Sequence, residues 1–419
     1  MAIACCVTLA VTSPHAQGVA ATAAASLPAT VTIDDVIRLL EQQSPRTLAD
    51  RASVDVVAAD RITARTYPNP DVSFGALRLV SGLSTGAVSQ QQAVVDQPVL
   101  IFRQRQARLD AADLNVTAER AKVAETLAGR RLQVREAFTT LLSRQQQLEV
   151  IRVSLADLER VEGVVRGRAE AGERSQYDVT RIETETETVR VEVLNAEADV
   201  EEASGQLASL LGFPGWSPRA TGDLQPDLRV SSDFDALWVT AQQRRPSLVA
   251  IRGKQAAARG GLLLAQRERL PIPSLSAGTQ ITQDVHGTSL FLGFSLPVPL
   301  FDHNQGAITR AEAQVKAQEL ALDAELAEAH AEIESATRVL SKRREALMTL
   351  EARVVERVPA LRRMSEDAYQ EGGADILELL DAMRSVKDIQ VAHVKQLEDS
   401  KLAEEMVVSV AGLDAQATP

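Results

Sequence analysis

Residues 271–301 read PIPSLSAGTQITQDVHGTSLFLGFSLPVPLF, and their alternation decides the fold. Apolar side chains recur at every second position on both sides of a polar turn at Gly287, so each run has one apolar face and one face of small polar residues. Each run has about ten residues, enough for a tilted strand to cross a bilayer. We expect strands at about 273–282 and 288–298 in a membrane barrel, with lipid on the apolar face and water on the other. A soluble sheet with one face on a core is the alternative.

The same arrangement occurs about 200 residues earlier, and such a constant offset indicates internal duplication. Two further strand-like runs lie at about 71–80 and 89–99, and each half opens with a short helix, a Gln-Gln pair and a proline. The structural repeats are expected at 31–211 and 232–412, joined by a linker at 212–231 that prolines and glycines interrupt. Prolines and phenylalanines that flank the strands are predicted to form the junction between barrel and helices: Pro68, Pro70, Pro98, Phe102, Pro271, Pro273, Pro297 and Phe301.

Each half then continues into a very long helix, a glycine turn and a shorter returning helix, which predicts helical hairpins at 103–211 and 302–412. No proline interrupts 103–171, so that helix would be roughly 100 Å long. We expect the returning helix and the helix at 246–269 to stack end to end beside it. Apolar residues at alternating three- and four-residue steps predict coiled-coil seams. They are Val179, Ile182, Val189, Val193, Ala196, Val200, Ala203, Leu207 and Leu210, with Leu148, Ile151, Leu155 and Leu158, and in the second half Leu347, Leu350, Val354, Leu361 and Met364.

The ends of the chain are expected to lie outside the fold. Residues 1–16 resemble a secretory signal with a cut after Ala16, and a disordered apolar tail is the alternative. Residues 17–30 would form a flexible segment and 413–419 a tail. Cys5 and Cys6 both lie in the presumed signal, so the mature chain would have no disulfide and no thiolate metal site.

The charge distribution and the motifs exclude several classes of function. The net charge is −12 and the basic residues are scattered, which argues against a nucleic-acid partner. The histidines lack the spacing of a chelating pair, and no phosphate loop or nucleophile elbow occurs. We therefore expect no enzyme activity, no catalytic residue, no metal site and no cofactor. The acidic repeat 183–187 is interpreted as a solvated helix face, with a cation-attracting surface as the alternative.

Four strands cannot close a barrel, and open sheet edges in lipid leave backbone groups unpaired at several kcal/mol each. The chain is therefore expected to form a homotrimer, in which three copies supply twelve strands around a solute-wide lumen. The long hairpins would stand side by side as a hollow cylinder. The fold class is thus mainly α with membrane β, built from duplicated helical hairpins and four strands per chain.

From about residue 31 to residue 413 the chain resembles the TolC-like outer membrane factors. The resemblance rests on the duplicated plan, on Pro68-Asn69-Pro70 before the first strand, and on the turns GERSQYDV at 172–179 and GGADILEL at 372–379. The stretch LPVPLFDHNQGAI at 296–308 is similar to the cobalt–zinc–cadmium (CzcC-like) heavy-metal efflux branch.

The resemblance implies a passive trimeric duct in the outer membrane of a Gram-negative bacterium, with a helical extension through the periplasm. A periplasmic adaptor and an inner-membrane pump of the RND type would be its partners, and metal cations its cargo. A multidrug or type I protein-secretion conduit is an alternative, as is a periplasmic coiled-coil scaffold or adaptor. The hairpin turns implied to contact the adaptor comprise Gly172, Glu173, Arg174, Ser175, Gly372, Gly373 and Ala374.

Acidic side chains follow these turns at Asp178, Asp375 and Glu378. Threefold symmetry would turn a pore-facing acid into a ring of three, and carboxylate rings favour cations. The alternative is that these acids stabilise helix N-termini or pair with basic groups of the adaptor.

Overall fold

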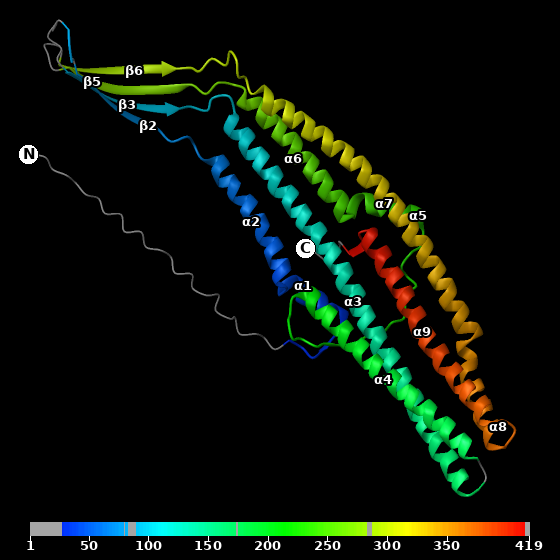
Figure 1. Cartoon of the computed structure of the whole chain (residues 1–419). Helices are drawn as coiled ribbons and strands as arrows, with labels where there is room; N and C mark the ends of the chain where they lie inside the picture. The colour runs from blue at the N-terminus through cyan, green and yellow to red at the C-terminus, as the bar shows by residue number, and fades with distance from the viewer. Residues whose placement is uncertain (1–26, 79, 83–88, 173–174, 283–286, 415–419) are drawn as a thin grey trace, which may run out of the picture.

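The computed structural model describes residues 27–78, 80–82, 89–172, 175–282 and 287–414. The expected signal, most of the expected flexible segment and the end of the tail lie outside these residues. The molecule is elongated, with four strands at one end and long helices running away from them (Figure 1). Its elements are β1 (Thr30–Val31), α1 (Ile33–Gln42), α2 (Pro45–Arg65), β2 (Asp71–Arg78), β3 (Ser89–Pro98), α3 (Gln104–Glu170), α4 (Gln176–Leu211), β4 (Arg219–Ala220), α5 (Phe234–Arg244), α6 (Pro246–Glu268), β5 (Ser274–Thr282), β6 (Thr288–Ser295), α7 (Gln305–Arg353), the 3₁₀ turn η1 (Val355–Arg357), α8 (Val358–Gln370) and α9 (Ile376–Val410).

The four membrane-type strands form one antiparallel sheet in the order β2-β3-β5-β6. Its register aligns the alternating side chains: Val72 pairs with Val95, Val95 with Ala277, and Ala277 with Leu292. One face is therefore apolar across all four strands. The opposite face carries residues such as Gln92 and its partner Gln280. The alternation predicted from sequence is confirmed.

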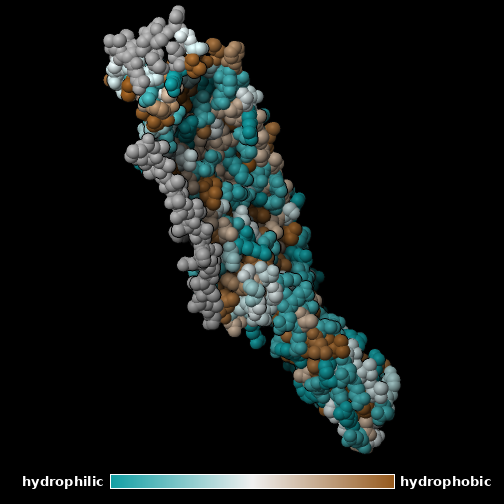
Figure 2. All heavy atoms as spheres, turned by 60° about the vertical axis from the view of Figure 1, so that its left-hand side comes forward, coloured by the Kyte–Doolittle hydropathy of each residue, from teal (hydrophilic) through white to brown (hydrophobic). Residues whose placement is uncertain are grey.

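The apolar face of this sheet is uncovered in the single chain. Five of its large side chains are 67–80 % exposed, namely Val72, Phe74, Leu290, Leu292 and Phe294. Figure 2 shows apolar surface at the strand end and mostly polar surface along the helices, interrupted by smaller apolar patches. Strands β2 and β6 are the two edges, and within the described residues neither has a second strand partner. None of the described helices is both long and apolar enough to cross a membrane.

The helices form a layer in which two long rods, α3 and α7, alternate with two rods that are each made of two helices. Helix α3 has 67 residues and is one uninterrupted helix, about 100 Å long. The sequence analysis expected the returning helix of the first hairpin, α4, to stack end to end with α6, and that pairing is wrong. Helix α4 continues α2 on one side of α3, and α9 continues α6 between α3 and α7 (Figure 1).

Two glycines make these end-to-end joints. Gly212 ends α4 at φ +82°, and a Cβ placed there would lie 3.3 Å from Cδ of Pro45, the first residue of α2. Gly412, just after α9, has φ +68°, and its Cβ would lie 2.8 Å from the backbone N of Arg245 at the start of α6. Glycine adopts this left-handed conformation without the steric cost that a Cβ brings. Each joint therefore brings the glycine after a returning helix against the start of the helix that it continues, at Pro45 in the first half and at Arg245 in the second.

The seam of the first hairpin is buried as predicted. Ile182 is fully buried in one cluster with Leu158 of α3 and Leu379 of α9, so the seam joins the two hairpins as well as the two helices of one. In the second hairpin the prediction is partly wrong: Leu347 is buried, but Leu361 and Met364 are exposed.

The long helix of the second half is also broken, contrary to expectation. Helix α7 ends at Arg353, and α8 starts after the 3₁₀ turn. Pro359 lies in the first turn of α8. A proline has no N–H to donate to the carbonyl of residue i−4, and its ring clashes with that carbonyl, here Val355, so a continuous α-helix cannot pass through it.

Candidate functional site

The prolines and phenylalanines predicted as junction residues lie where the strands pass into the helices. Pro68 and Pro70 lie between α2 and β2, Pro271 and Pro273 between α6 and β5, Pro98 ends β3, and Pro297 follows β6, with Phe102 and Phe301 just before α3 and α7.

Direct hydrogen bonds hold the neighbouring crossings together. The Val99 amide donates to the Pro273 carbonyl oxygen at 2.8 Å, and the Gln97 side chain donates to the Pro68 carbonyl oxygen at 3.0 Å. These bonds fix the orientation of the sheet on the helical layer.

A pair of glutamine side-chain hydrogen bonds at the junction was not predicted from the sequence. Gln104 and Gln305 begin α3 and α7, and the Oε1 of each accepts the backbone N–H two residues earlier at 3.0 Å. The residues before them, Arg103 and Asn304, both have left-handed backbones, with φ of 61° and 63°. The duplicated glutamine was the available signal. Each glutamine stabilises a tight turn from strand into helix.

The hairpin tips are short, exposed glycine turns. Gly172 and Gly372 have φ of +82° and +78°, and a Cβ at either would meet nothing within 4 Å. In the second tip Gly373 N donates to the Ala368 carbonyl oxygen at 2.8 Å, and Ala374 N donates to the same oxygen at 3.1 Å. Glu173 and Arg174 lie outside the described residues. The remaining tip residue, Ser175, is exposed and is the N-cap of α4.

The acids after the tips are used as helix caps. The Asp178 carboxylate accepts the Ser175 amide at 3.3 Å, and the Glu378 carboxylate accepts the Asp375 amide at 3.2 Å. Asp375 accepts the Glu378 amide at 2.8 Å in return. Both sites are capping boxes, which satisfy backbone donors at a helix start. Asp375 and Glu378 nevertheless remain exposed.

Ion pairs connect the two hairpins near the tips. Arg384 of α9 lies 2.6 Å from Glu185 of α4, and Lys387 of α9 lies 2.5 Å from Glu192. Hydrogen bonding to Glu185 raises the pKa of Arg384. Glu185 belongs to the acidic repeat that was interpreted as solvated, so that interpretation is wrong for this residue, whose side chain is 12 % exposed.

A third pair lies between α3 and α8. Arg362 is 2.5 Å from Asp157, which is buried. Because α8 is the short helix beyond the break, this contact ties the free end of the second hairpin to the first.

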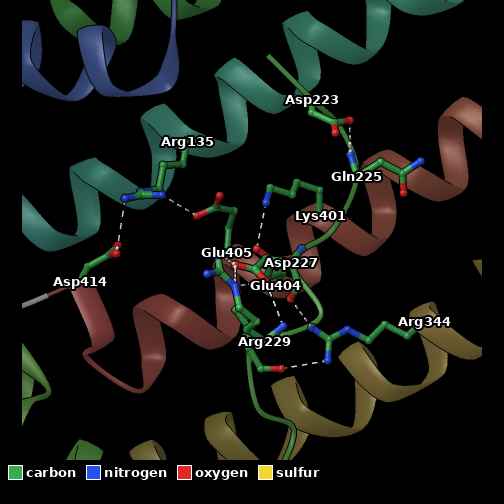
Figure 3. Close-up of polar contacts among 11 residues, drawn as sticks. Arg135, Asp223, Gln225, Asp227, Arg229, Arg344, Lys401, Glu404, Glu405 and Asp414 are labelled. Atoms are coloured by element: carbon green, nitrogen blue, oxygen red, sulfur yellow. Dashed lines mark hydrogen bonds and ion pairs between the residues drawn. The ribbon is translucent and has the colours of Figure 1, made fainter.

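The linker between the repeats is fastened to the helices by charges that are partly buried (Figure 3). Glu404 of α9 accepts the Asp227 amide at 2.5 Å, and Arg344 of α7 donates to the Asp227 and Val230 carbonyl oxygens at 2.9 Å each. Hydrogen bonds from Arg229 lower the pKa of Asp227 to about 2.

Beside the linker, Glu405 lies 3.1 Å from Arg135 of α3, and burial raises its pKa. The linker, α1 and α5 lie on one face of the helical layer. We call these three segments the belt.

Among the residues that the structure describes, no group of three or more histidine, cysteine or acidic side chains could hold an ion. His393 lies 3.0 Å from Glu351 in a two-residue contact. His330 packs edge-on against Phe234 and Trp238. Both histidines therefore make packing or pairing contacts within the fold.

Comparison with known proteins agrees with this architecture. The family model for outer membrane efflux proteins matches residues 36–213 and 237–413. The chain is 24 % identical to the cobalt-zinc-cadmium resistance protein CzcC of Cupriavidus metallidurans over 87 % of its length and 86 % of that protein. It is 23 % identical to the nickel-cobalt-cadmium resistance protein NccC of Alcaligenes xylosoxydans xylosoxydans, over 71 % and 68 %.

The fold is shared with solved channels. The outer-membrane channel OprN superposes with a TM-score of 0.72 at 19 % identity, covering 91 % of this chain and 89 % of that one. The chain therefore belongs to the outer membrane efflux protein family: it is a non-enzymatic efflux channel of the outer membrane whose helices extend into the periplasm.

Proposed function

We propose that three copies of this chain form a continuous exit duct. The observation that carries the proposal is the four-stranded sheet, which has one apolar face and two edges, β2 and β6, that have no second strand partner among the described residues. In lipid, each edge needs a partner strand. Pairing β6 of one copy with β2 of the next satisfies every edge once three copies close the ring. Purified protein in detergent should have the mass of three chains, and a monomer would overturn the proposal.

The helical layers of the three copies would then close into a tube. One face of each layer carries the belt of α1, α5 and the linker. A cylinder has more room on its outer side than on its inner side, so we assign the belt to the outside and the bare face to the lumen.

At the far end of this tube, the turns formed by Gly172, Ser175, Gly372, Gly373 and Ala374 are proposed to contact a periplasmic adaptor that joins the duct to an inner-membrane RND pump. Glu173 and Arg174 belong to the same proposed surface. The exposure of the turns, and the open space around their glycines, support this assignment.

Opening of the tips would separate the hairpins, so it must break the ion pairs between them. Those pairs are Asp157–Arg362, Glu185–Arg384 and Glu192–Lys387. We propose that they hold the closed arrangement together with the seam at Ile182. Replacing Arg384 by glutamine should raise single-channel conductance in a planar bilayer, while Arg338→Gln, which breaks a pair within α7, should not.

Asp178, Asp375 and Glu378 are proposed to line the constricted end as acidic rings. Amide substitution separates the two roles of these acids, because asparagine and glutamine can still accept the capping hydrogen bonds. Asp375→Asn together with Glu378→Gln should therefore keep the fold and reduce cation selectivity. An unchanged reversal potential in a salt gradient would eliminate the ring.

The cargo is proposed to be divalent heavy-metal cations. The two metal-resistance relatives support this, since one of them spans nearly the whole chain. Deleting the gene should reduce tolerance to cobalt, zinc and cadmium, and a plasmid copy should restore it. Loss of drug tolerance with unchanged metal tolerance would overturn the metal assignment and leave the duct.

A further inference from the structure

A hollow of about 800 Å³ lies where α6 and α9 meet end to end between α3 and α7. This volume is within the range of small-molecule sites, roughly 300–1,000 Å³. Leu132 of α3, Val339 of α7 and Leu402 of α9 contribute apolar walls. We call it the joint pocket.

The joint pocket opens on the face of the layer opposite the belt. On α3 it is lined by Glu125, Leu132 and Glu136, whereas Arg131 of the same helix pairs with Glu41 of α1 in the belt. At about 100° per residue, the pocket residues lie about 100–140° around α3 from Arg131, so they face away from the side that contacts α1.

Helix α9 shows the same division. Leu402 and Met406 line the pocket, and Glu404, which binds the linker, lies about 200° away around the helix. In the proposed trimer, on which this placement rests, the pocket faces the lumen.

The charges in the joint pocket do not balance. Arg245 is paired with Glu332 at 2.5 Å and Arg343 with Asp399 at 2.9 Å. The remaining acids, Glu125 and Glu136, have no cation within ion-pair distance among the described residues. Arg245 and Lys254 attract the Glu125 carboxylate from beyond ion-pair distance, so its charge is only partly compensated. Burying a carboxylate that no cation contacts is costly, and a bound cation would relieve that cost. Burial raises the pKa of both groups in agreement with this.

Their spacing constrains the ligand. Glu125 and Glu136 are eleven positions apart on one face of α3, which is about 16 Å along the axis. Leu132 and the apolar walls lie between them. A small hydrated metal ion could not contact both acids or use the apolar surface.

We propose that the joint pocket binds amphiphilic organic cations, with an apolar body between the helices and a cationic end at Glu125 or Glu136. A dication with charges at both ends would contact both carboxylates. The wall of the duct would thus hold a class of molecule that differs from the metal cargo.

The test is titration of purified trimer with dequalinium, a fluorescent dication whose two quinolinium rings are joined by an alkyl chain. Saturable binding at one site per chain is expected. Each of Glu125→Gln and Glu136→Gln should weaken it about tenfold, as loss of one charged contact does. The matched control is Glu170→Gln, on the same helix roughly 50 Å from Glu136, and it should bind as the wild type does.

A second variant keeps the acids and fills the space between them. Leu132→Trp should abolish binding while the trimer, checked by mass in detergent, stays intact. Non-saturable uptake that is equal in all variants would show partition into detergent and overturn the proposal, as would tight binding by the Glu125→Gln/Glu136→Gln double variant. Metal tolerance is a separate readout: unchanged tolerance after deletion of the gene, with dye binding by the purified trimer intact, would overturn the metal cargo and leave the pocket.

Discussion

Replacing Gly412 by alanine tests the end-to-end joint between α9 and α6. At φ +68° an alanine is strained by about 1–2 kcal/mol. Its Cβ would also lie 2.8 Å from the Arg245 nitrogen and 2.9 Å from the Arg244 carbonyl carbon and oxygen. These are backbone atoms that cannot rotate away, so overpacking adds about 1–3 kcal/mol.

Two other glycines provide the controls. Gly372 has a similar φ but open space around its Cβ position, so Gly372→Ala carries the strain alone. Gly212 would meet only the Pro45 ring at 3.3 Å, so Gly212→Ala should fall between them. The loss of unfolded-state entropy is the same for all three substitutions and cancels in the comparison.

The assay is the apparent melting temperature of detergent-purified protein at one scan rate, because unfolding of such an assembly is governed by kinetics. The expected loss is largest for Gly412→Ala and smallest for Gly372→Ala. Amide exchange at the end of α9 and the start of α6 should accelerate only in Gly412→Ala. Equal losses for Gly412→Ala and Gly372→Ala would refute the proposed contact.

Two further predictions concern the helices. Ile182→Ala removes a fully buried side chain from the seam and should lower the free energy of unfolding by about 2–5 kcal/mol. The control is Met364→Ala, at a side chain that is 70 % exposed, which should change the melting temperature of the isolated chain little. Similar losses in the two variants would contradict the seam. Burial raises the pKa of Glu405 above its ordinary value of 4.5, so the folded state holds this proton more tightly, and stability declines as pH rises from 4.5 through the raised pKa. Glu405→Gln should flatten that decline in melting curves taken between about pH 4 and pH 8, and an unchanged slope would show that another group causes it.

Local patterns predicted most of the elements. Alternation in 71–99 and 273–298 yielded the strands and their lipid-facing side, because a strand repeats every two residues irrespective of its neighbours. The three- and four-residue steps around Ile182 gave the first seam in the same way. The second seam failed at Leu361 and Met364, where the apolar repeat continues past the helix break before Pro359 and the side chains remain exposed.

The candidate sites also divide into those that a local pattern locates and those that depend on tertiary contacts. The junction prolines and the tip glycines could be located from sequence, since both residue types act on their own backbone. The ion-pair partners of Asp157 and Glu185, and the charged surroundings of Glu125, could not be located, because a charge pattern does not tell which helix lies opposite. Glu185 pairs with Arg384, about 200 positions away, and Arg245 and Lys254 act on Glu125 from more than 100 positions away.

The sequence by itself determined the duplication, the strand faces and the hairpins, all of which follow from short-range periodicity. Only the tertiary structure decided that α4 continues α2 and that α9 continues α6, because that choice depends on how Gly212 and Gly412 let distant helix ends approach Pro45 and Arg245. The joint between α9 and α6 also produces the hollow between α3 and α7. Its physical basis is close packing between segments far apart in the chain, which no local repeat encodes.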